Sequence, residues 1–451
     1  MSRNAICTLL ILCALFAARA TLAGPRKLDD GTTVDRWTLP NGLEVVARDV
    51  PGTHAISVVW GYRTGLDHDP VDRPGLASLL AEVAFTAPAG DTPERTRDEM
   101  ESLRPQGWSL RVTRRQTLFN ETATTSQFPG VLHQIAGRMR GVAVTDEALR
   151  GSLATVRRSL GEKYLGTADQ ILYWQVREYA RGLDQDAVAA LAAAKGLDRE
   201  TPASVQQAIA RAYVPANGAL AIAGNLSGLD LRSIIAAEFG ALPAGERLPS
   251  PPPSHFDSVR VLLRQPGVDA PVAVLGLMAP ALSDTLHPSF FMALLMLGGR
   301  ARLVWDDPAA PLTTRFQYSL LDDPTFARLY PSVDPQRPPD PRSPVATLNE
   351  FIDGMLTGTI QRETYDGFRY NLLWMMGGPM PQSLLDGVRR DPAALNVLCT
   401  SLASQALWGN EAFWAEYRRR FDVAVSPEFG FWKRWLQDPA HQATLVLAPK
   451  R

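Results

Sequence analysis

Ser78 and Glu82 are the residues of this chain whose types and spacing first suggest chemistry, a hydroxyl and a carboxylate one helical turn apart. They lie in the stretch 75–85, where apolar residues at positions 76, 79, 80 and 83 follow helical spacing after Pro74. Ser78, Ala81 and Glu82 share the opposite stripe of this predicted helix. A single carboxylate does not hold a water-activating zinc, which takes three protein ligands. Ser78 has no candidate base nearby in the sequence, so we do not expect it to be a nucleophile.

The frame around these positions resembles the inverted zinc motif G-L-A-H-x-x-E-H-x-x-F of the insulinase, pitrilysin and mitochondrial processing peptidase family. Four frame residues stand in register: Gly75, Leu76, Ala77 and Phe85. Ser78 replaces the first histidine ligand, Ala81 the glutamate base and Glu82 the second histidine. The resemblance therefore implies a degenerate motif. We expect no catalytic residue, no metal and no cofactor here, although active relatives carry zinc.

The third zinc ligand of active relatives is a glutamate about 76 residues after the second histidine. Counted from Glu82, that position falls near Arg158, beside Arg157, and the next acid is Glu162. A small shift of the alignment would place Glu162 at the position of the third ligand. This leaves open the alternative of an altered site built from Glu82 and Glu162. Zinc prefers nitrogen and sulfur donors, so metal binding is not expected. The count also predicts that Ser78→His, Ala81→Glu and Glu82→His together would need Arg158→Glu to take up zinc.

Two further segments carry the resemblance. The stretch 37–48, WTLPNGLEVVAR, is similar to the opening hairpin L-x-N-G-L-x-V of the family. The stretch 213–224 is similar to its closing signature Y-x-P-x-N-x-x-L-x-x-x-G, a turn followed by an apolar strand. In the second half, strands at 259–263, 272–277 and 442–448 repeat this order weakly. We therefore expect an α+β fold with two homologous domains, each a mainly antiparallel sheet packed with helices on one side.

The expected domain organisation begins with a signal peptide at residues 1–23, where Arg3 precedes an apolar run and a small-residue cleavage site. The N-terminal domain is expected at 24–247, a proline-rich linker at 248–255 and the C-terminal domain at 256–451. These features predict a periplasmic protein, possible secretion being left open, with no membrane span after signal removal. The net charge of −1 does not favour nucleic acid.

Substrate contacts are expected at three positions by resemblance. Arg111 stands where the edge strand of active relatives carries an asparagine that grips extended substrate. Arg302 and Tyr318 lie in a stretch similar to S-R-L…L-R-x-x-x-G-x-x-Y-S, whose arginine and tyrosine bind the substrate carbonyl. The arginine seven residues before Tyr318 is missing, so a core tyrosine with a satisfied hydroxyl is the alternative.

Isolated histidines and the mature cysteine suggest no further site. His68 lies between Asp67 and Asp69 on a polar loop, and three adjacent residues do not easily converge on one ion. His133 is expected on a helix surface, and Cys399 is expected to be a buried, inert thiol.

Three functions remain open. The first is a non-catalytic subunit that pairs with an active zinc peptidase of the same family and contributes contacts to unstructured peptides. The second is a zinc metalloendopeptidase with altered ligands. The third is a stand-alone periplasmic protein that binds peptides or acts as a scaffold.

Overall fold

The computed structural model describes residues 24–251, 255–269, 271–298, 316–330, 372–423 and 428–450, together with 352, 366, 367, 369 and 370. The expected signal peptide at 1–23, Arg302 and residues 252–254 of the expected linker lie outside the described residues.

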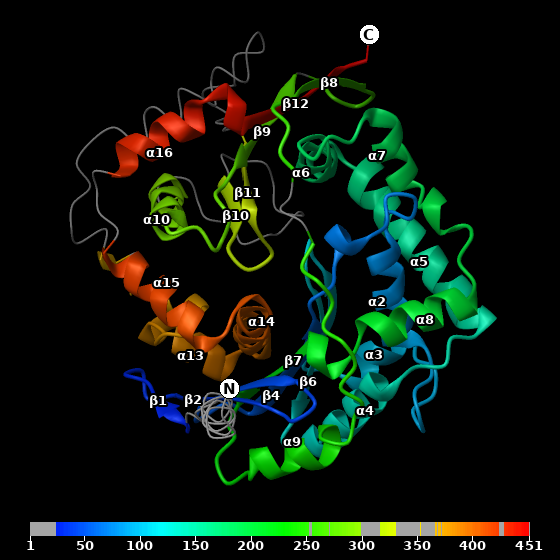
Figure 1. Ribbon diagram of the computed structural model, residues 1–451, viewed down its shortest axis with the longest axis vertical. Coiled ribbons are helices and arrows are strands. Elements are labelled where there is room, and N and C mark those ends of the chain that lie inside the picture. Colours follow the sequence, from blue (N-terminus) through cyan, green and yellow to red (C-terminus); the bar gives the residue numbers. More distant parts are fainter. Residues whose placement is uncertain are drawn as a thin grey trace, which may run out of the picture.

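The first half of the chain forms a seven-stranded sheet in the order β1-β2-β3-β7-β4-β6-β5 (Figure 1). Its strands are β1 Arg26–Lys27, β2 Thr33–Thr38, β3 Glu44–Asp49, β4 Ala55–Tyr62, β5 Trp108–Val112, β6 Thr117–Thr124 and β7 Gly218–Gly224. β3 and β7 run parallel, and all other neighbours are antiparallel. The predicted turn at Asn41-Gly42 joins β2 to β3, with Gly42 at φ 87° and Asn41 Oδ1 accepting from the Leu43 N–H at 3.2 Å.

The second half repeats this unit in a five-stranded sheet of order β10-β11-β9-β12-β8. Its strands are β8 Arg260–Gln265, β9 Val272–Met278, β10 Phe316–Ser319, β11 Asp323–Leu329 and β12 Gln442–Pro449. β8 and β12 run parallel, as β3 and β7 do, and the remaining neighbours are antiparallel. Five strands therefore recur with the same order and directions. This confirms the expected α+β fold of two similar, mainly antiparallel units; the exact domain boundaries stay a prediction.

Helices of both halves surround the two sheets. In the first half they are α2 Leu76–Thr86, α3 Arg97–Leu103, α4 Phe128–Arg140, α5 Asp146–Leu165, α6 Ala168–Tyr179, α7 Gln185–Ala192, α8 Pro202–Ala212 and α9 Leu231–Phe239. In the second they are α10 His287–Gly298, α13 Gln382–Arg390, α14 Pro392–Trp408, α15 Glu411–Val423 and α16 Glu428–Gln437. The Thr145 hydroxyl caps α5 by accepting from the Ala148 N–H at 3.0 Å.

The two halves also exchange helices, which the sequence did not predict. α14 packs on β4 and β7 of the first sheet, and α6 packs on β9 and β12 of the second (Figure 1). Successive side chains of β7 point into the two different cores. Leu220 and Ile222 face the first core, whereas Ala219, Ala221 and Ala223 face the core that contains α14. Each sheet is therefore covered on both faces, with the second face covered by a helix of the opposite half. Within the described residues, no helix has the length and apolar character of a membrane span.

Candidate functional site

The motif helix α2 is anchored at its N-terminus by Asp69. The Asp69 carboxylate accepts the N–H of Gly75 and the N–H of Ala77, each at 2.7 Å. Gly75 has φ 92°, a left-handed conformation that favours glycine, and a Cβ there would lie 3.0 Å from Leu160 Cδ1 of α5. The glycine of the frame thus has a structural reason, because it lets α2 start close against α5.

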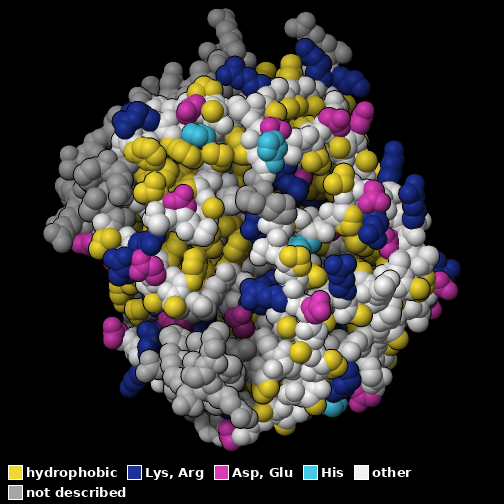
Figure 2. Space-filling model, in the orientation of Figure 1, with side chains coloured by type: hydrophobic (Ala, Val, Ile, Leu, Met, Phe, Trp, Pro, Cys, Tyr) yellow, Lys and Arg dark blue, Asp and Glu magenta, His cyan; other side chains and the backbone are white. Residues whose placement is uncertain are grey.

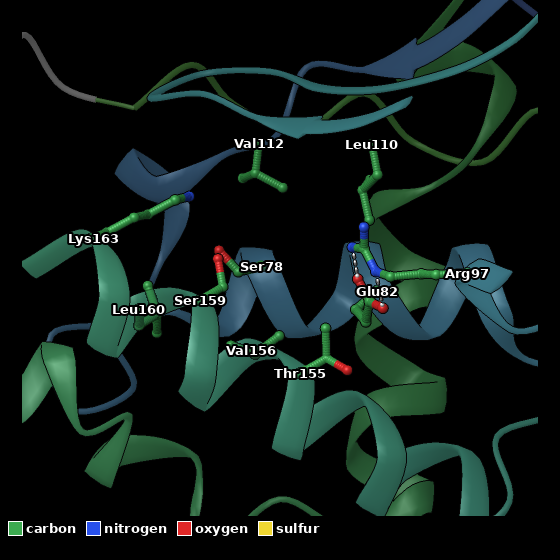
Figure 3. Close-up of a pocket in the computed structure, with 10 residues that line it drawn as sticks. All are labelled: Ser78, Glu82, Arg97, Leu110, Val112, Thr155, Val156, Ser159, Leu160 and Lys163. Carbon is green, nitrogen blue, oxygen red and sulfur yellow. Dashed lines mark hydrogen bonds and ion pairs between the residues drawn. The ribbon is translucent and has the colours of Figure 1, made fainter. Parts of the chain in front are cut away.

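Glu82 is buried on α2 and its carboxylate is held by Arg97. Oε2 accepts from Arg97 Nη2 at 2.6 Å and Oε1 accepts from Nε at 3.2 Å (Figure 3). The Glu82 side chain is 5% exposed and that of Arg97 is 43% exposed. Arg97 is the first residue of α3, and its guanidinium also lies 5.4 Å from the centre of the Trp108 ring. Both carboxylate oxygens are therefore engaged by a bidentate cation of the protein itself.

The wall of the pocket opposite α2 is formed by α5. Its residues are not the ones predicted by counting along the sequence from Glu82. Thr155, Ser159 and Lys163 of α5 line a pocket of about 80 Å³ with Ser78 and Glu82. In Figure 3 the hydroxyls of Ser78 and Ser159 point toward each other. Burial, with a smaller contribution from Arg111, lowers the pKa of Lys163, whose Nζ lies 4.9 Å from the centre of the Trp174 ring.

The predicted placement of Arg158 opposite the motif is wrong. Arg157, Arg158 and Glu162 are exposed and do not line the pocket, and Arg157 pairs with Asp198 beyond α5. One residue along a helix turns a side chain by about 100°, so position 159 faces the motif helix and position 158 faces away. The cations beside the motif are Arg97 and Lys163, rather than the predicted arginine pair.

The residues present do not fit the zinc that the resemblance implies in active relatives. The pocket offers hydroxyls from Ser78, Thr155 and Ser159, and the carboxylate of Glu82, which is already paired with Arg97. No imidazole or thiolate lines it, and Ala81 supplies no base. Across the part of the chain that the structure describes, no group of three or more histidine, cysteine or acidic residues is placed to hold a metal ion.

β5 lies at the edge of the first sheet, above the pocket. The flanking hydrogen bonds, Thr122 N–H to Gly107 O and Thr113 N–H to Gln116 O, fix which residues of β5 bond to β6. By antiparallel alternation, the backbone groups of positions 108, 110 and 112 point away from the sheet. Among the described strands none pairs with this edge. The edge is therefore open to an extended segment, directly beside the pocket that Leu110 and Val112 line.

Arg111 lies on the other face of β5 from this pocket. Its guanidinium forms an ion pair with Asp322, in the turn between β10 and β11, and Ser319 Oγ donates to the same carboxylate at 2.8 Å. Arg111 thus joins the edge strand of the first half to a hairpin of the second. A contact between Arg111 and substrate stays a prediction.

Tyr318 belongs to a buried hydrogen-bonded network around His287. The Tyr318 hydroxyl lies 2.8 Å from His287 Nε2 and donates to Pro324 O at 2.9 Å, while His287 Nδ1 lies 2.7 Å from the Tyr417 hydroxyl. Burial lowers the pKa of His287 to about 4, so the ring is neutral at neutral pH. The hydroxyl of Tyr318 has partners within the fold, as the core alternative expects, and its contact with a substrate carbonyl stays a prediction.

The remaining histidines and Cys399 have ordinary surroundings. His68 Nδ1 accepts from the Gly65 N–H at 3.2 Å, and His133, 57% exposed, lies 3.1 Å from Glu238. Cys399 is buried on α14, where its Sγ lies 3.2 Å from Ser57 O, and burial raises its pKa to about 12. The sequence missed Arg97, Lys163 and His287 as residues of interest. Only Arg97 had a local signal, the T-x-x-E capping box at 96–99 that starts its helix.

Comparison with known proteins gives the fold. No family model matches the sequence, and no curated protein matches it. A protease from Helicobacter pylori superposes with a TM-score of 0.68 at 14% identity, covering 92% of this chain and 99% of that chain. The peptidase M16 inactive domain from Pseudomonas fluorescens gives 0.67 at 12% identity, covering 93% and 98%. The chain has the M16 peptidase fold.

The periplasmic protease PqqL from Escherichia coli is also similar, with a TM-score of 0.64 at 12% identity over 95% of this chain and 48% of PqqL. This chain thus has the extent of about half of that protease. The insulinase-type fold expected from the frame at Gly75 is confirmed. The assignment of Ser78, Ala81 and Glu82 to motif positions rests on the sequence frame, because at such identities the likeness is one of fold.

Proposed function

We propose that this chain is a non-catalytic subunit of the M16 fold, which pairs with an active zinc peptidase and helps it to hold unstructured peptides. The observation that carries the proposal is the Glu82–Arg97 pair. At the position where the resemblance expects the second histidine, a buried carboxylate is bound bidentately by a guanidinium. A protein cation thereby neutralises the one acidic group at the motif, and Ser78 and Ala81 bring neither a ligand nor a base.

Pairing is proposed from the family resemblance and from the two similar units that the structure describes. The resemblance implies that four units of this kind enclose a peptidase chamber, and this chain contains two. It corresponds to about half of PqqL, which is a single, longer protease chain. A second, active chain would supply the other two units. The periplasm is proposed as the location from the signal-like segment at 1–23 and from the periplasmic protease among the structural neighbours.

The test is reconstitution with an active M16-fold peptidase from the same cell. We expect a complex on size-exclusion chromatography and faster cleavage of an unstructured peptide by the mixture than by the active chain alone. Glu82→Gln with Arg97→Gln should preserve this gain, because the pair is not used for catalysis. Elution as separate chains, together with unchanged cleavage, would contradict the proposal.

A second candidate, peptide capture without any partner, is favoured by the open edge of β5. It predicts affinity of the isolated chain for extended peptides. Leu110→Pro removes a backbone N–H that points away from β6, so it should abolish such binding and keep the fold. Leu110→Val keeps the N–H and is the matched control. Binding by the isolated chain that Leu110→Pro abolishes, with no complex in the reconstitution, would favour capture.

The altered-ligand peptidase makes a separate prediction, which elemental analysis tests. It requires one zinc per chain after mild purification, and hydrolysis that a chelator stops. A chain that is free of zinc and inactive after incubation with zinc would dismiss it.

A further inference from the structure

Among the described strands, β8 lies at an edge of the second sheet. Thr444 N–H donates to Val259 O at 2.7 Å and Lys450 N–H donates to Gln265 O at 3.3 Å. These bonds show that odd-numbered residues of β8 bond to β12, the parallel neighbour. The N–H and C=O groups of Arg260, Leu262 and Arg264 therefore point outward, and none of the described strands pairs with them.

The equivalent edge of the first half is covered by the chain itself. β3 occupies the place in the first sheet that β8 occupies in the second, parallel to the closing strand of its unit. β2 pairs antiparallel with β3 over six residues, and β1 extends that cover. The repeat thus shows which partner this edge accepts, namely one more antiparallel strand.

The side chains on the open strand specify the chemistry of that partner. Exposure alternates along β8, so Arg260, Leu262 and Arg264 share the exposed face, and Leu262 is 58% exposed. No ion pair of Arg260 or Arg264 occurs within the described residues, and Arg264 donates only weakly, to Pro449 O at 3.4 Å. Lys450 is exposed at the end of β12, and Asp269, also exposed, follows the turn after β8. Figure 2 shows Lys and Arg side chains gathered at this end of the molecule, where Figure 1 places β8 and β12.

A second copy of this chain does not suit the edge. Antiparallel pairing of two β8 strands about Leu262 would set Arg260 of one copy against Arg264 of the other, at both ends of the contact. Like charges directly opposite each other destabilise a strand pair, and arginines on an edge strand oppose self-association.

We propose that the outer edge of β8 docks an extended segment of a partner protein with the pattern acidic–x–apolar–x–acidic. The segment adds an antiparallel strand to the five-stranded sheet. Its acidic side chains face Arg260 and Arg264, and its apolar side chain packs beside Leu262. This surface is distinct from β5, which lies at the edge of the other sheet. The inference stands whether or not the proposed function holds.

The test uses the full chain and a short capped peptide that alternates threonine with glutamate, valine and glutamate, carrying a fluorescent label. We expect saturable binding by fluorescence anisotropy that weakens as salt is added. Arg260→Glu with Arg264→Glu should weaken binding about tenfold, because it turns two opposite-charge pairs across the strands into like-charge pairs. The same double variant should bind the lysine version of the peptide better than the wild type does.

Leu262→Pro provides the backbone test. The N–H of Leu262 is not used by β12, so proline there should leave the sheet intact and abolish peptide binding. Leu262→Thr keeps the N–H and should still bind. The proposal is overturned if the acidic peptide does not bind the wild type, if glutamate and lysine peptides bind equally, or if folded Leu262→Pro binds as the wild type does. Dimerisation of the wild type that Leu262→Pro abolishes would also overturn it, in favour of a second copy.

Discussion

At the scale of single residues, the Glu82–Arg97 pair distinguishes this site from a metal centre. A carboxylate that is 5% exposed needs a counter-charge, and here a guanidinium provides it with two hydrogen bonds. In a zinc site the same role falls to the ion. Glu82 stands where the resemblance expects a histidine. Arg97, fifteen residues further along the chain, lies beside it and supplies the counter-charge.

Arg97→Ala should lower the free energy of unfolding by about 2 kcal/mol, because it leaves the Glu82 carboxylate buried without its partner. The value is discounted from that of a fully buried pair, since Arg97 is partly exposed. Adding Glu82→Gln should recover most of the loss. Urea unfolding of both single variants and the double variant gives the coupling energy. Additive losses would mean that the two side chains do not stabilise each other.

His287 should make the protein sensitive to acid. Its pKa in the folded state is about 4, below its ordinary value of 6.5, so the folded state binds fewer protons than the unfolded chain between these values. Stability is therefore full above pH 6.5 and falls as the pH drops through this window, by up to about 3 kcal/mol. In urea titrations at several pH values, His287→Gln should flatten this slope. Val397→Ala, a change without a titratable group at a position that is 52% exposed, should leave it unchanged.

At the scale of elements, the register of α5 decides which residue could complete a grafted zinc site. Ser159 lines the pocket with Ser78, whereas Arg158 is exposed. We expect Ser78→His, Ala81→Glu and Glu82→His together to take up no zinc. Adding Ser159→Glu should bring zinc toward one ion per chain, and adding Arg158→Glu should not. Elemental analysis after dialysis distinguishes the two. Equal uptake by both quadruple variants would show that α5 does not set the third ligand.

The elements themselves were largely predictable, and the reasons for the failures are physical. Helical spacing after Pro74 identified α2, and the turn before Gly218 identified β7, because local patterns determine both. A count along the chain cannot resolve one residue of helical register, so it selected Arg158. The Glu82–Arg97 contact spans a loop, and no local pattern encodes it. α14 is apolar over most of its surface, so its sequence does not reveal which sheet it covers.

At the scale of the whole molecule, the exchange of α14 and α6 joins the two halves. Each half leaves one face of its sheet to be buried by a helix of the other, and the two cores contain residues from both halves. Hydrogen bonds also join the two halves. The Arg63 guanidinium donates to Leu407 O at 3.0 Å, and Arg328 Nε donates to Tyr173 O at 2.8 Å. We therefore expect the halves to unfold as one cooperative unit.

Leu407→Ala tests this coupling. Leu407 is buried at the end of α14, and its Cδ1 lies 3.2 Å from the place where a Cβ would stand on Gly61 of β4. Removing it should cost about 2–4 kcal/mol through the lost contacts and the cavity. Because the halves share this helix, hydrogen exchange should show the same fall in opening free energy for β4 and for β9 amides. Val397→Ala, on the same helix but 52% exposed, should change neither by more than about 0.5 kcal/mol. A fall in opening free energy that is confined to β4 would show that the halves open separately. It would mean that α14 can leave the first sheet while its own half stays folded.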